Sequence, residues 1–351
     1  MSEISPAKFR RALLGWYRRN QRDLPWRRTR DPWAIHVSEI MLQQTRVAAV
    51  LPYYERFLVR YPTPDAFAQA SESELLACWA GLGYYSRARN LQKAAERIAL
   101  TGEYPRDYRD IRALPGVGDY TAAAIGSIAF GHARAAVDGN VLRVFARITA
   151  EKADPRAGAT RERLTETAQA LVHPNRPGPN RPGDFNQALM ELGATVCLPR
   201  NPRCAACPVS RWCEAHALGL QHQLPVKSPK PPSVDVVRRL LIIQRNGAVL
   251  LCRVAADSRR LAGFWDLPEA EQIPGARIQK TVAEFRHTIV NTNHRCHVSL
   301  ASAGRRATPP ELRWTPLARI ASLPLSTMAR KALALAGLAK CDANPAHSPR
   351  V

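Results

Sequence analysis

The stretch from Leu114 to Asn140 constrains the fold of this chain more than any other. It opens with Leu114-Pro115-Gly116-Val117-Gly118, continues as a run of small residues, and closes with Val137-Asp138-Gly139-Asn140. Glycines on both sides of Val117 can adopt positive φ and expose backbone N–H groups. A helix directly after them adds the positive end of its dipole, which favours phosphate. The stretch predicts a phosphate-binding helix hairpin with Asp138 in the next turn; an ordinary hairpin with an Asp turn is the alternative.

The charge of the chain limits its partners. Among 351 residues, 51 Lys and Arg oppose 29 Asp and Glu, a formal net charge of +22. This excess suits a polyanionic partner, a property that basic tails and ribosomal proteins share. The chain is long enough for two domains, each with its own core. Because we find neither a membrane-spanning apolar run nor an apolar signal core, we expect a soluble cytoplasmic protein with no membrane partner.

Four cysteines are crowded into one short segment with the spacing C-x6-C-x2-C-x5-C. They are Cys197, Cys204, Cys207 and Cys213. Four thiolates hold either zinc or a [4Fe–4S] cluster, and the C-x2-C element is compatible with both. The isolated cysteines are interpreted as buried or free thiols; they are Cys78, Cys252, Cys296 and Cys341.

The N-terminal region is predicted to be helical. One helix is expected over Ala7–Tyr17, and another is expected to begin with Asp31 as N-cap and Pro32 as first residue, and to continue through Thr45. Glu39 lies in an apolar part of the second helix, where burial would raise its pKa towards that of a general acid. A solvated glutamate is the more common outcome for such a position taken alone.

The pattern changes along the second half of the chain. Helices are expected to resume after Asn140, with an irregular insert over 173–183 and a Pro-rich linker over 221–233. Beyond the linker, Asn246-Gly247 separates two apolar runs and predicts a β-hairpin. A strand near 296–300 and a helix after Ser326 complete an α+β region.

Several of these stretches together resemble the adenine DNA glycosylases (the MutY family) of the helix-hairpin-helix, endonuclease III superfamily. The resemblance rests on the hairpin stretch, the cysteine spacing, and the segment from Asp23-Leu24-Pro25-Trp26 to Leu42-Gln43-Gln44-Thr45. It implies a multi-domain protein in which an all-α helix-hairpin-helix glycosylase precedes an α+β Nudix-like domain. The implied boundaries are 1–220 for the catalytic region with its iron–sulfur loop at 197–213, 221–233 for the linker, 234–340 for the Nudix-like domain, and 341–351 for a tail.

The resemblance also implies a monofunctional glycosylase that removes adenine opposite 8-oxoguanine, or opposite G, from double-stranded DNA. Tyr120 occupies the position at which bifunctional relatives carry a Schiff-base lysine, and Tyr cannot form an imine. Glu39 would protonate adenine N7, Asp138 would stabilise the oxocarbenium, and Tyr120 and Asn140 would position both. The implied adenine pocket consists of Arg22, Trp26, Leu42, Val47 and Gln187. The residues implied to read the opposite base are Gln44, Thr45, Leu82 and Tyr84. The implied phosphate hairpin is Leu114, Pro115, Gly116, Val117 and Gly118, and the implied ligands of a [4Fe–4S] cluster are Cys197, Cys204, Cys207 and Cys213.

Two other classes of protein share part of this pattern. One is a bifunctional glycosylase/lyase for oxidised pyrimidines, and the other is a non-catalytic damage-binding protein. Tyr120 opposes the first, and the presence of both carboxylates opposes the second. We expect a monomer associated with a bacterial nucleoid.

The C-terminal region departs from the family pattern in one place. The family's Phe-Ser-His element is replaced by Ile289-Val290-Asn291, which leaves Thr292, Asn293 and His294 as candidates for lesion contact. Glu269, Glu271 and Glu284 do not form the glutamate-rich helix of a Nudix hydrolase, so we interpret this domain as a reader of damaged DNA.

Overall fold

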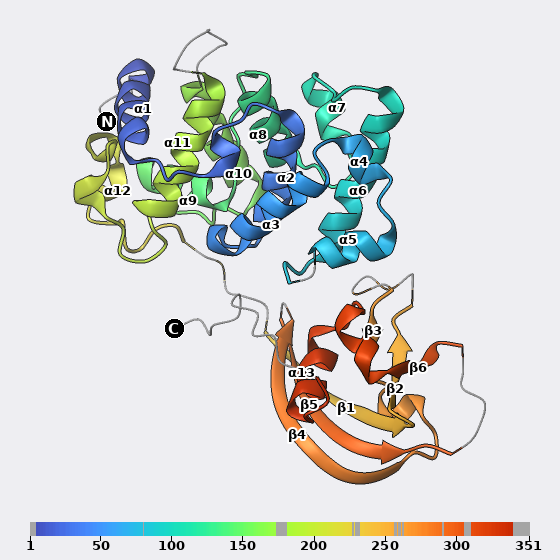
Figure 1. The fold of residues 1–351 in the computed structure, drawn as a ribbon. Helices are drawn as coiled ribbons and strands as arrows, with labels where there is room; N and C mark the ends of the chain where they lie inside the picture. The colour runs from blue at the N-terminus through green and yellow to red at the C-terminus, as the bar shows by residue number, and fades with distance from the viewer. Residues whose placement is uncertain are drawn as a thin grey trace. The chain divides into compact units, whose positions relative to one another are not determined.

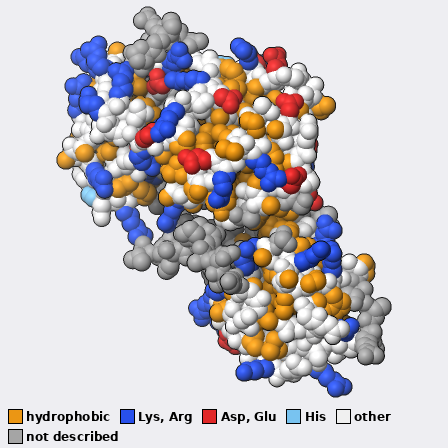
Figure 2. Space-filling view, viewed as in Figure 1, with side chains coloured by type: hydrophobic (Ala, Val, Ile, Leu, Met, Phe, Trp, Pro, Cys, Tyr) orange, Lys and Arg blue, Asp and Glu red, His pale blue; other side chains and the backbone are white. Residues whose placement is uncertain are grey.

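The structure, a computed structural model, describes residues 5–79, 81–172, 181–226, 228, 232–255, 258, 261, 263–289, 291–304 and 310–339. The chain divides into two compact units (Figure 1). Unit 1 comprises Met1–Cys78 and Ser86–Pro229, and unit 2 comprises Trp79–Tyr85 and Lys230–Val351. Lys and Arg side chains are distributed over the visible faces of both units (Figure 2). Within the described part of the chain, no helix combines the length and apolar character needed to cross a membrane.

The region before the linker is helical, as predicted. Its elements are α1 (Pro6–Asn20), η1 (Pro25–Arg27), α2 (Pro32–Leu42), α3 (Val47–Arg60), α4 (Pro64–Ala68), α5 (Glu72–Trp79), α6 (Tyr85–Thr101), α7 (Tyr108–Arg112), α8 (Asp119–Ala129), α9 (Gly139–Ile148), α10 (Gly158–Leu171), α11 (Pro182–Thr195), η2 (Cys204–Ala206), η3 (Ser210–Trp212) and α12 (Glu214–Ala217). One apolar core lies among α1, α9, α10 and α11, and a second surrounds α8. These two cores fix α8, α9 and α11 as the frame of the unit.

Helix α2 begins as the sequence predicts and ends earlier. The Asp31 side chain accepts hydrogen bonds from the N–H groups of Trp33 and Ala34, and Pro32 is the first helical residue. The helix ends at Leu42, whereas the sequence predicted that it would continue through Thr45. Gln44 has a φ of 57°, a left-handed conformation that cannot continue a right-handed helix. Gln44 and Thr45 therefore lie in the turn between α2 and α3.

The predicted hairpin joins α7 to α8. Gly116 has a φ of 77°, and a Cβ at this position would lie 2.7 Å from the Asn90 Cβ, so only glycine fits without strain. The sequence allows positive φ at Gly118 as well, but only Gly116 of the two glycines adopts it. Gly118 is the extended N-cap of α8, with a φ of −94°. The first glycine makes the turn, and the second begins the helix.

The predicted insert over 173–183 is too long at its C-terminal end. Residues 173–180 lie outside the described part of the chain, whereas Pro182 and Gly183 form the first turn of α11. Proline suits the first helical position because its missing N–H would have no partner inside the helix. A Cβ on Gly183 would lie 2.7 Å from the Ile128 Cα, so glycine permits the close approach of α11 to α8.

Unit 2 is built on a mixed sheet. Its strands are β1 (Val234–Arg245), β2 (Ala248–Arg253), β3 (Trp265–Asp266), β4 (Arg277–Ile289), β5 (Thr292–Ser302) and β6 (Leu312–Pro316), with η4 (Ala270–Gln272), η5 (Leu317–Ser322) and α13 (Thr327–Leu335). The strand order is β3-β2-β1-β5-β4, and β6 pairs with β2. Only the β1–β5 pairing is parallel among the described strand pairs. The α+β prediction for this region is confirmed.

Two local predictions for unit 2 are confirmed as well. Asn246 and Gly247 both have positive φ, at 46° and 72°, and join β1 to β2 in the predicted hairpin. The predicted C-terminal helix is α13, which begins after Ser326; the Ser326 side chain caps it by accepting from the Ala329 N–H. Met328 and Ala332 of α13 pack with Phe285 and Val298 on the inner face of the sheet.

Candidate active site

A pocket of about 220 Å³ lies within unit 1 and is lined by all four predicted catalytic residues. Its walls come from η1, α2, the start of α3, α8, the N-terminus of α9, and α11. The lining residues are Arg22, Leu24, Trp26, Arg27, Ile35, Ser38, Glu39, Leu42, Thr45, Val47, Tyr120, Ile128, Asp138, Asn140, Gln187, Met190 and Ala194. All nine residues predicted for catalysis and for the adenine pocket are therefore brought together.

Glu39 provides a carboxylic acid in this pocket. Every residue of α2 from Trp33 to Met41 is buried, and Glu39 itself is 6% exposed. Burial raises the pKa of Glu39 to about 7; a hydrogen bond with Tyr120 lowers it, and the charge of Asp138 raises it. A carboxyl group with such a pKa is substantially protonated near neutral pH and can donate a proton.

Asp138 provides a carboxylate in a contrasting environment. It is the N-cap of α9 and accepts hydrogen bonds from the backbone N–H groups of Asn140 at 2.9 Å and Val141 at 2.8 Å. The Asn140 side-chain amide donates to its other oxygen at 2.9 Å. These donors and the positive end of the α9 dipole stabilise negative charge on Asp138. The pocket thus holds two carboxyl groups in opposite environments.

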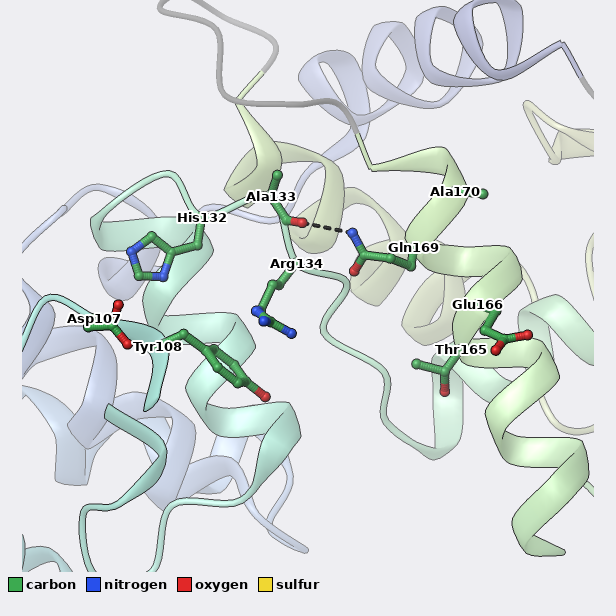
Figure 3. A pocket seen from close by; sticks show the side chains of 9 residues that line it. All are labelled: Asp107, Tyr108, His132, Ala133, Arg134, Thr165, Glu166, Gln169 and Ala170. Atoms are coloured by element: carbon green, nitrogen blue, oxygen red, sulfur yellow. Dashed lines mark hydrogen bonds between the residues drawn. The ribbon is translucent and has the colours of Figure 1, made fainter. Parts of the chain in front are cut away.

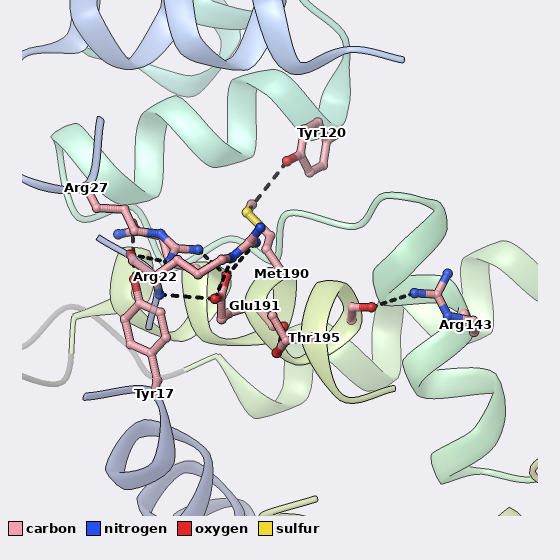
Figure 4. Close-up of polar contacts among 10 residues, drawn as sticks. Tyr17, Arg22, Arg27, Tyr120, Arg143, Met190, Glu191 and Thr195 are labelled. Carbon is pink, nitrogen blue, oxygen red and sulfur yellow. Dashed lines mark hydrogen bonds and ion pairs between the residues drawn. The ribbon is translucent and has the colours of Figure 1, made fainter. Parts of the chain in front are cut away.

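Tyr120 lies close to both acids. It is the second residue of α8, and its hydroxyl donates to the Met190 Sδ at 3.6 Å (Figure 4). Burial raises the pKa of Tyr120 well above its ordinary value, and the charges of Glu39 and Asp138 raise it further. Tyr120 therefore stays neutral and can serve as a hydrogen-bond donor to either carboxyl group.

Two arginines of the pocket lining, Arg22 and Arg27, belong to a buried ion-pair cluster. Glu191 has a fully buried side chain and accepts from the Arg22 Nε and Nη2 at 2.8 Å each and from the Arg27 Nη2 at 2.7 Å. Figure 4 shows both guanidinium groups converging on this carboxylate. Burial alone would raise the pKa of Glu191, but the hydrogen bonds from the two arginines outweigh it and hold the pKa at about 2. The cluster fixes Arg22 at the edge of the pocket.

The remaining pocket residues supply an amide and an apolar surface. The Tyr17 hydroxyl donates to the Gln187 Oε1 at 3.4 Å. Because this bond engages the amide oxygen, the NH₂ group of Gln187 can donate to other partners. Trp26 is buried and meets the Tyr54 ring edge-on, with 5.2 Å between the ring centroids. Leu42 and Val47 contribute apolar side chains to the pocket lining. Leu42 is the last residue of α2 and Val47 is the first residue of α3.

The residues predicted to read the opposite base are only partly brought to the pocket. Thr45 lines it, whereas Gln44, Leu82 and Tyr84 do not. Leu82 is buried at 7% exposure, while Tyr84 is 54% exposed with a φ of 50°. Likewise, the hairpin of Leu114, Pro115, Gly116, Val117 and Gly118 lies outside the lining of the pocket.

Arg87 supports the Gln43–Thr45 turn through side-chain hydrogen bonds. Its Nη1 donates to the carbonyls of Ile40 and Met41 at 2.9 Å each, and also to that of Gln43. Its Nη2 donates to the Thr45 Oγ1 at 3.1 Å. These bonds satisfy carbonyl groups that the end of α2 leaves open, and they fix the left-handed Gln44.

The four clustered cysteines lie beside α9. The Arg147 Nη1 donates to the Cys197 Sγ, and the Cys213 Sγ donates to the Arg147 carbonyl, both at 3.3 Å. Burial, with smaller contributions from the three other cysteines, raises the pKa of the Cys207 thiol to about 12. None of the four forms a disulfide bond. In the described part of the chain, no three Cys, His, Asp or Glu side chains stand in a metal-binding arrangement. Four thiols without His or carboxylate are the donor set of either a structural zinc site or a [4Fe–4S] cluster.

A second, larger and more open pocket of about 900 Å³ lies between α7 and α10 (Figure 3). The Arg134 guanidinium stacks on the Tyr108 ring at 3.9 Å, and the Gln169 amide bonds the backbone of Ala133 and Ala135. It contains Asp107 and Glu166 but no buried acid, so the chemistry is better placed in the smaller pocket.

Three arginines and one glutamate that support the site were not predicted from the sequence. They are Arg27, Arg87, Arg143 and Glu191. Arg87 and Glu191 occupy positions that continue the apolar face of a helix, α6 for Arg87 and α11 for Glu191. A charged residue in such a position signals a buried ion pair or a capped helix end.

Comparison with known proteins agrees with this geometry. A family model described as HhH-GPD superfamily base excision DNA repair protein matches residues 37–170. Adenine DNA glycosylase from Homo sapiens is 48% identical over 327 residues, which cover 78% of this chain and 59% of that protein. The Mus musculus adenine DNA glycosylase is 36% identical over 400 residues, covering 92% and 76% respectively. The chain thus spans 59% of the length of the human relative.

The helical fold also has a solved relative. The structure of a thermostable thymine-DNA glycosylase has a TM-score of 0.53 and 32% identity, covering 61% of this chain and 97% of that one. The predicted combination of a helical glycosylase fold with an α+β C-terminal region is confirmed.

Proposed function

This chain belongs to the adenine DNA glycosylase family, and we propose that it excises adenine from double-stranded DNA in which the adenine is mispaired with 8-oxoguanine or with G. The observation that carries the proposal is the pairing of Glu39 and Asp138 in one pocket with opposite electrostatic environments. Such a pair divides acid and charge-stabilising roles between two carboxyl groups.

The reaction needs the adenine outside the base stack, because its glycosidic bond is inaccessible within the duplex. With the flipped base in the pocket, protonated Glu39 would donate a proton to adenine N7 and make the base a better leaving group. As the N-glycosidic bond breaks, positive charge develops on the sugar. Asp138, held by Asn140 and the N-terminus of α9, would stabilise that oxocarbenium-like charge.

Tyr120 limits the reaction to base removal. Its neutral hydroxyl interacts with Glu39 through a hydrogen bond and with the charge of Asp138, so it would orient the two acids and the attacking water. A phenol cannot form an imine with the sugar, so the product would be an abasic site with an intact strand. The proposed activity is therefore that of a monofunctional glycosylase.

The cysteine segment would hold a [4Fe–4S] cluster through Cys197, Cys204, Cys207 and Cys213. The cluster would supply a rigid cross-link for a loop that also carries Arg200, Arg203 and Arg211. Arg147 supports the loop independently, because it donates to the carbonyls of Leu198 at 2.6 Å and Pro199 at 3.3 Å. These contacts hold the loop beside α9, the helix that Asp138 caps.

The opposite base would be read by Gln44 and Thr45, which lie in the turn fixed by Arg87, together with Leu82 and Tyr84. Unit 2 would contribute discrimination for 8-oxoguanine. Asn293 is the candidate there with the best-defined side chain, because it bonds both Thr288 and Asp235. Asn293→Ala should narrow the preference for adenine opposite 8-oxoguanine over adenine opposite G.

The decisive experiment compares three duplexes carrying A opposite 8-oxoguanine, A opposite T, or thymine glycol. We expect strand breaks only for the first duplex and only after alkali, since alkali cleaves at the abasic site. Strand breaks before alkali would indicate a lyase. Tight binding without any release of adenine would instead indicate a damage-binding protein.

A further inference from the structure

The outer face of the sheet in unit 2 carries a regular array of polar side chains near the β4–β5 hairpin. The antiparallel register pairs Glu284 with His297, Arg286 with Arg295, and Thr288 with Asn293. Because strand side chains alternate between faces, these six residues share one face of the sheet. Phe285 and Cys296, which lie one position away, are buried in the core on the other face.

Strand β1 extends the array on the other side of β5. Its parallel register places Asp235 beside Asn293, Val237 beside Arg295, and Arg239 beside His297. The face therefore consists of three rows across three strands. Among these nine side chains, Val237 is 53% exposed, and Arg286 and Arg295 are both exposed.

The two outer rows are satisfied internally. In one, the Thr288 hydroxyl donates to the Asn293 Oδ1 at 3.0 Å, and the Asn293 amide donates to the Asp235 Oδ1 at 2.9 Å. In the other, His297 pairs with Glu284 at 2.8 Å, while Arg239 pairs with Glu271 at 3.1 Å. The acidic groups on this face are thus engaged by other partners.

The middle row is different. Arg286 and Arg295 stand directly opposite each other, and no carboxylate of the described residues forms an ion pair with either. Like charges in directly opposite cross-strand positions repel and destabilise a sheet. An anion shared by the two guanidinium groups would replace this repulsion with attraction, and the planar forks of arginine match the oxygens of a phosphate.

We propose that Arg286 and Arg295 form a phosphate-binding pair through which unit 2 contacts the backbone of double-stranded DNA. The proposal rests on the proposed function, because it takes DNA as the partner. The positive charge of the pair suits a polyanion. Because both arginines are exposed on the sheet face, they can contact a phosphodiester without a pocket. Such a contact positions the domain and carries no sequence information.

The test compares the double variant Arg286→Ser/Arg295→Ser with the control Arg277→Ser/Lys280→Ser. The control removes the same charge from exposed residues of β4 at its other end. Equilibrium binding of the full chain to a duplex with A opposite 8-oxoguanine, and to a fully paired duplex, is measured between about 50 and 200 mM salt. We expect the double variant to lose roughly tenfold in affinity for both duplexes, and its logarithmic salt slope to fall by about 1 to 2. The control should remain within about twofold of wild type.

One further double variant and one small ligand separate the alternatives. Arg286→Lys/Arg295→Lys should keep most of the salt slope, because the charge remains, while losing part of the affinity, because the forks are gone. Equal binding by the double variant and the control would overturn the proposal. Inorganic phosphate is the small ligand. The proposal would also be overturned if phosphate raised the melting temperature of wild type and not of the double variant while the salt slope for DNA binding was the same in both proteins, because the pair would then bind free phosphate and not DNA. Failure of wild type to excise adenine would count against the proposed function, whereas the salt slope tests this pair separately.

Discussion

Arg143 and Asn140 are joined by a hydrogen bond of 3.0 Å, from the Arg143 Nη2 to the Asn140 Oδ1. The same arginine donates to the carbonyls of Cys197 at 2.9 Å and Gly193 at 2.8 Å. Because Asn140 in turn bonds Asp138, one buried guanidinium connects the carboxylate of the pocket with the first cysteine of the clustered segment. Helix α9 is therefore the element that couples the two sites.

Replacing Arg143 by Gln should slow adenine excision by roughly tenfold or more, because Asn140 loses the partner that orients its amide towards Asp138. Iron content should fall as well, since the Cys197 carbonyl loses its donor. Single-turnover kinetics and iron analysis of the same preparation check both effects. Arg163→Gln, which breaks a surface pair with Glu151, is the control. If Arg143→Gln slowed excision but kept its full iron content and an unchanged pH profile of the rate, Arg143 would not couple the pocket to the cysteine segment.

Asp138→Asn should retain affinity for mispaired DNA and lose nearly all turnover. The carboxylate acts on charge that develops as the bond breaks, so it contributes little to ground-state binding. Single-turnover excision and equilibrium binding on the same duplex separate the two quantities. Excision within about tenfold of wild type would show that Asp138 is not the charge-stabilising group.

The rate of excision should fall as pH rises through about 7, because Glu39 acts in its protonated form and its pKa is raised to about 7. Tyr120→Phe removes the hydrogen bond that lowers this pKa, so the alkaline limb should move to higher pH. Glu39→Gln should be slow at every pH. The check is the single-turnover rate across neutral pH for the three proteins. An alkaline limb that stays in place in Tyr120→Phe would exclude Glu39 as its origin.

Glu191→Gln should destabilise the fold by roughly 3 to 5 kcal/mol, because it leaves two arginines sharing a buried site without a counter-charge. The depressed pKa of Glu191 adds stability that is fully present above the ordinary glutamate pKa and is lost as pH falls towards about 2. The difference between wild type and variant should therefore shrink in acid. Denaturant unfolding at neutral and acidic pH measures this, with the exposed Glu162→Gln as control.

The purified protein should be brown and contain roughly four irons per chain, as a cluster held by four cysteines requires. Cys204→Ser should reduce iron content and DNA affinity more than the excision rate of the bound complex, since no residue of η2 lines the pocket. Metal analysis that returns zinc without iron would contradict the cluster. The isolated Cys78 provides the control, because Cys78→Ser should change neither metal content nor affinity.

The sequence by itself determined the local features. Asp31-Pro32 specifies the start of α2, Asn246-Gly247 specifies a hairpin, and Gly116 specifies a tight turn, because each depends on the conformations open to a few adjacent residues. The spacing of the clustered cysteines and the position of Tyr120 likewise follow from order along the chain. The sequence pattern was less reliable at helix ends, where Gln44 and Pro182 lie on the other side of the predicted boundary.

Only the tertiary structure decided which distant residues share a site. Glu191 is separated from Arg22 by 169 positions, and no local pattern pairs the two. The pKa of Glu39 depends on burial by other helices and on Tyr120 and Asp138, which arrive from α8 and the N-terminus of α9. The Arg286–Arg295 pair depends on strand register in the same way. Burial and charge pairing are properties of three-dimensional packing, and they convert a list of candidate residues into an acid, a stabilised carboxylate and a fixed pocket wall.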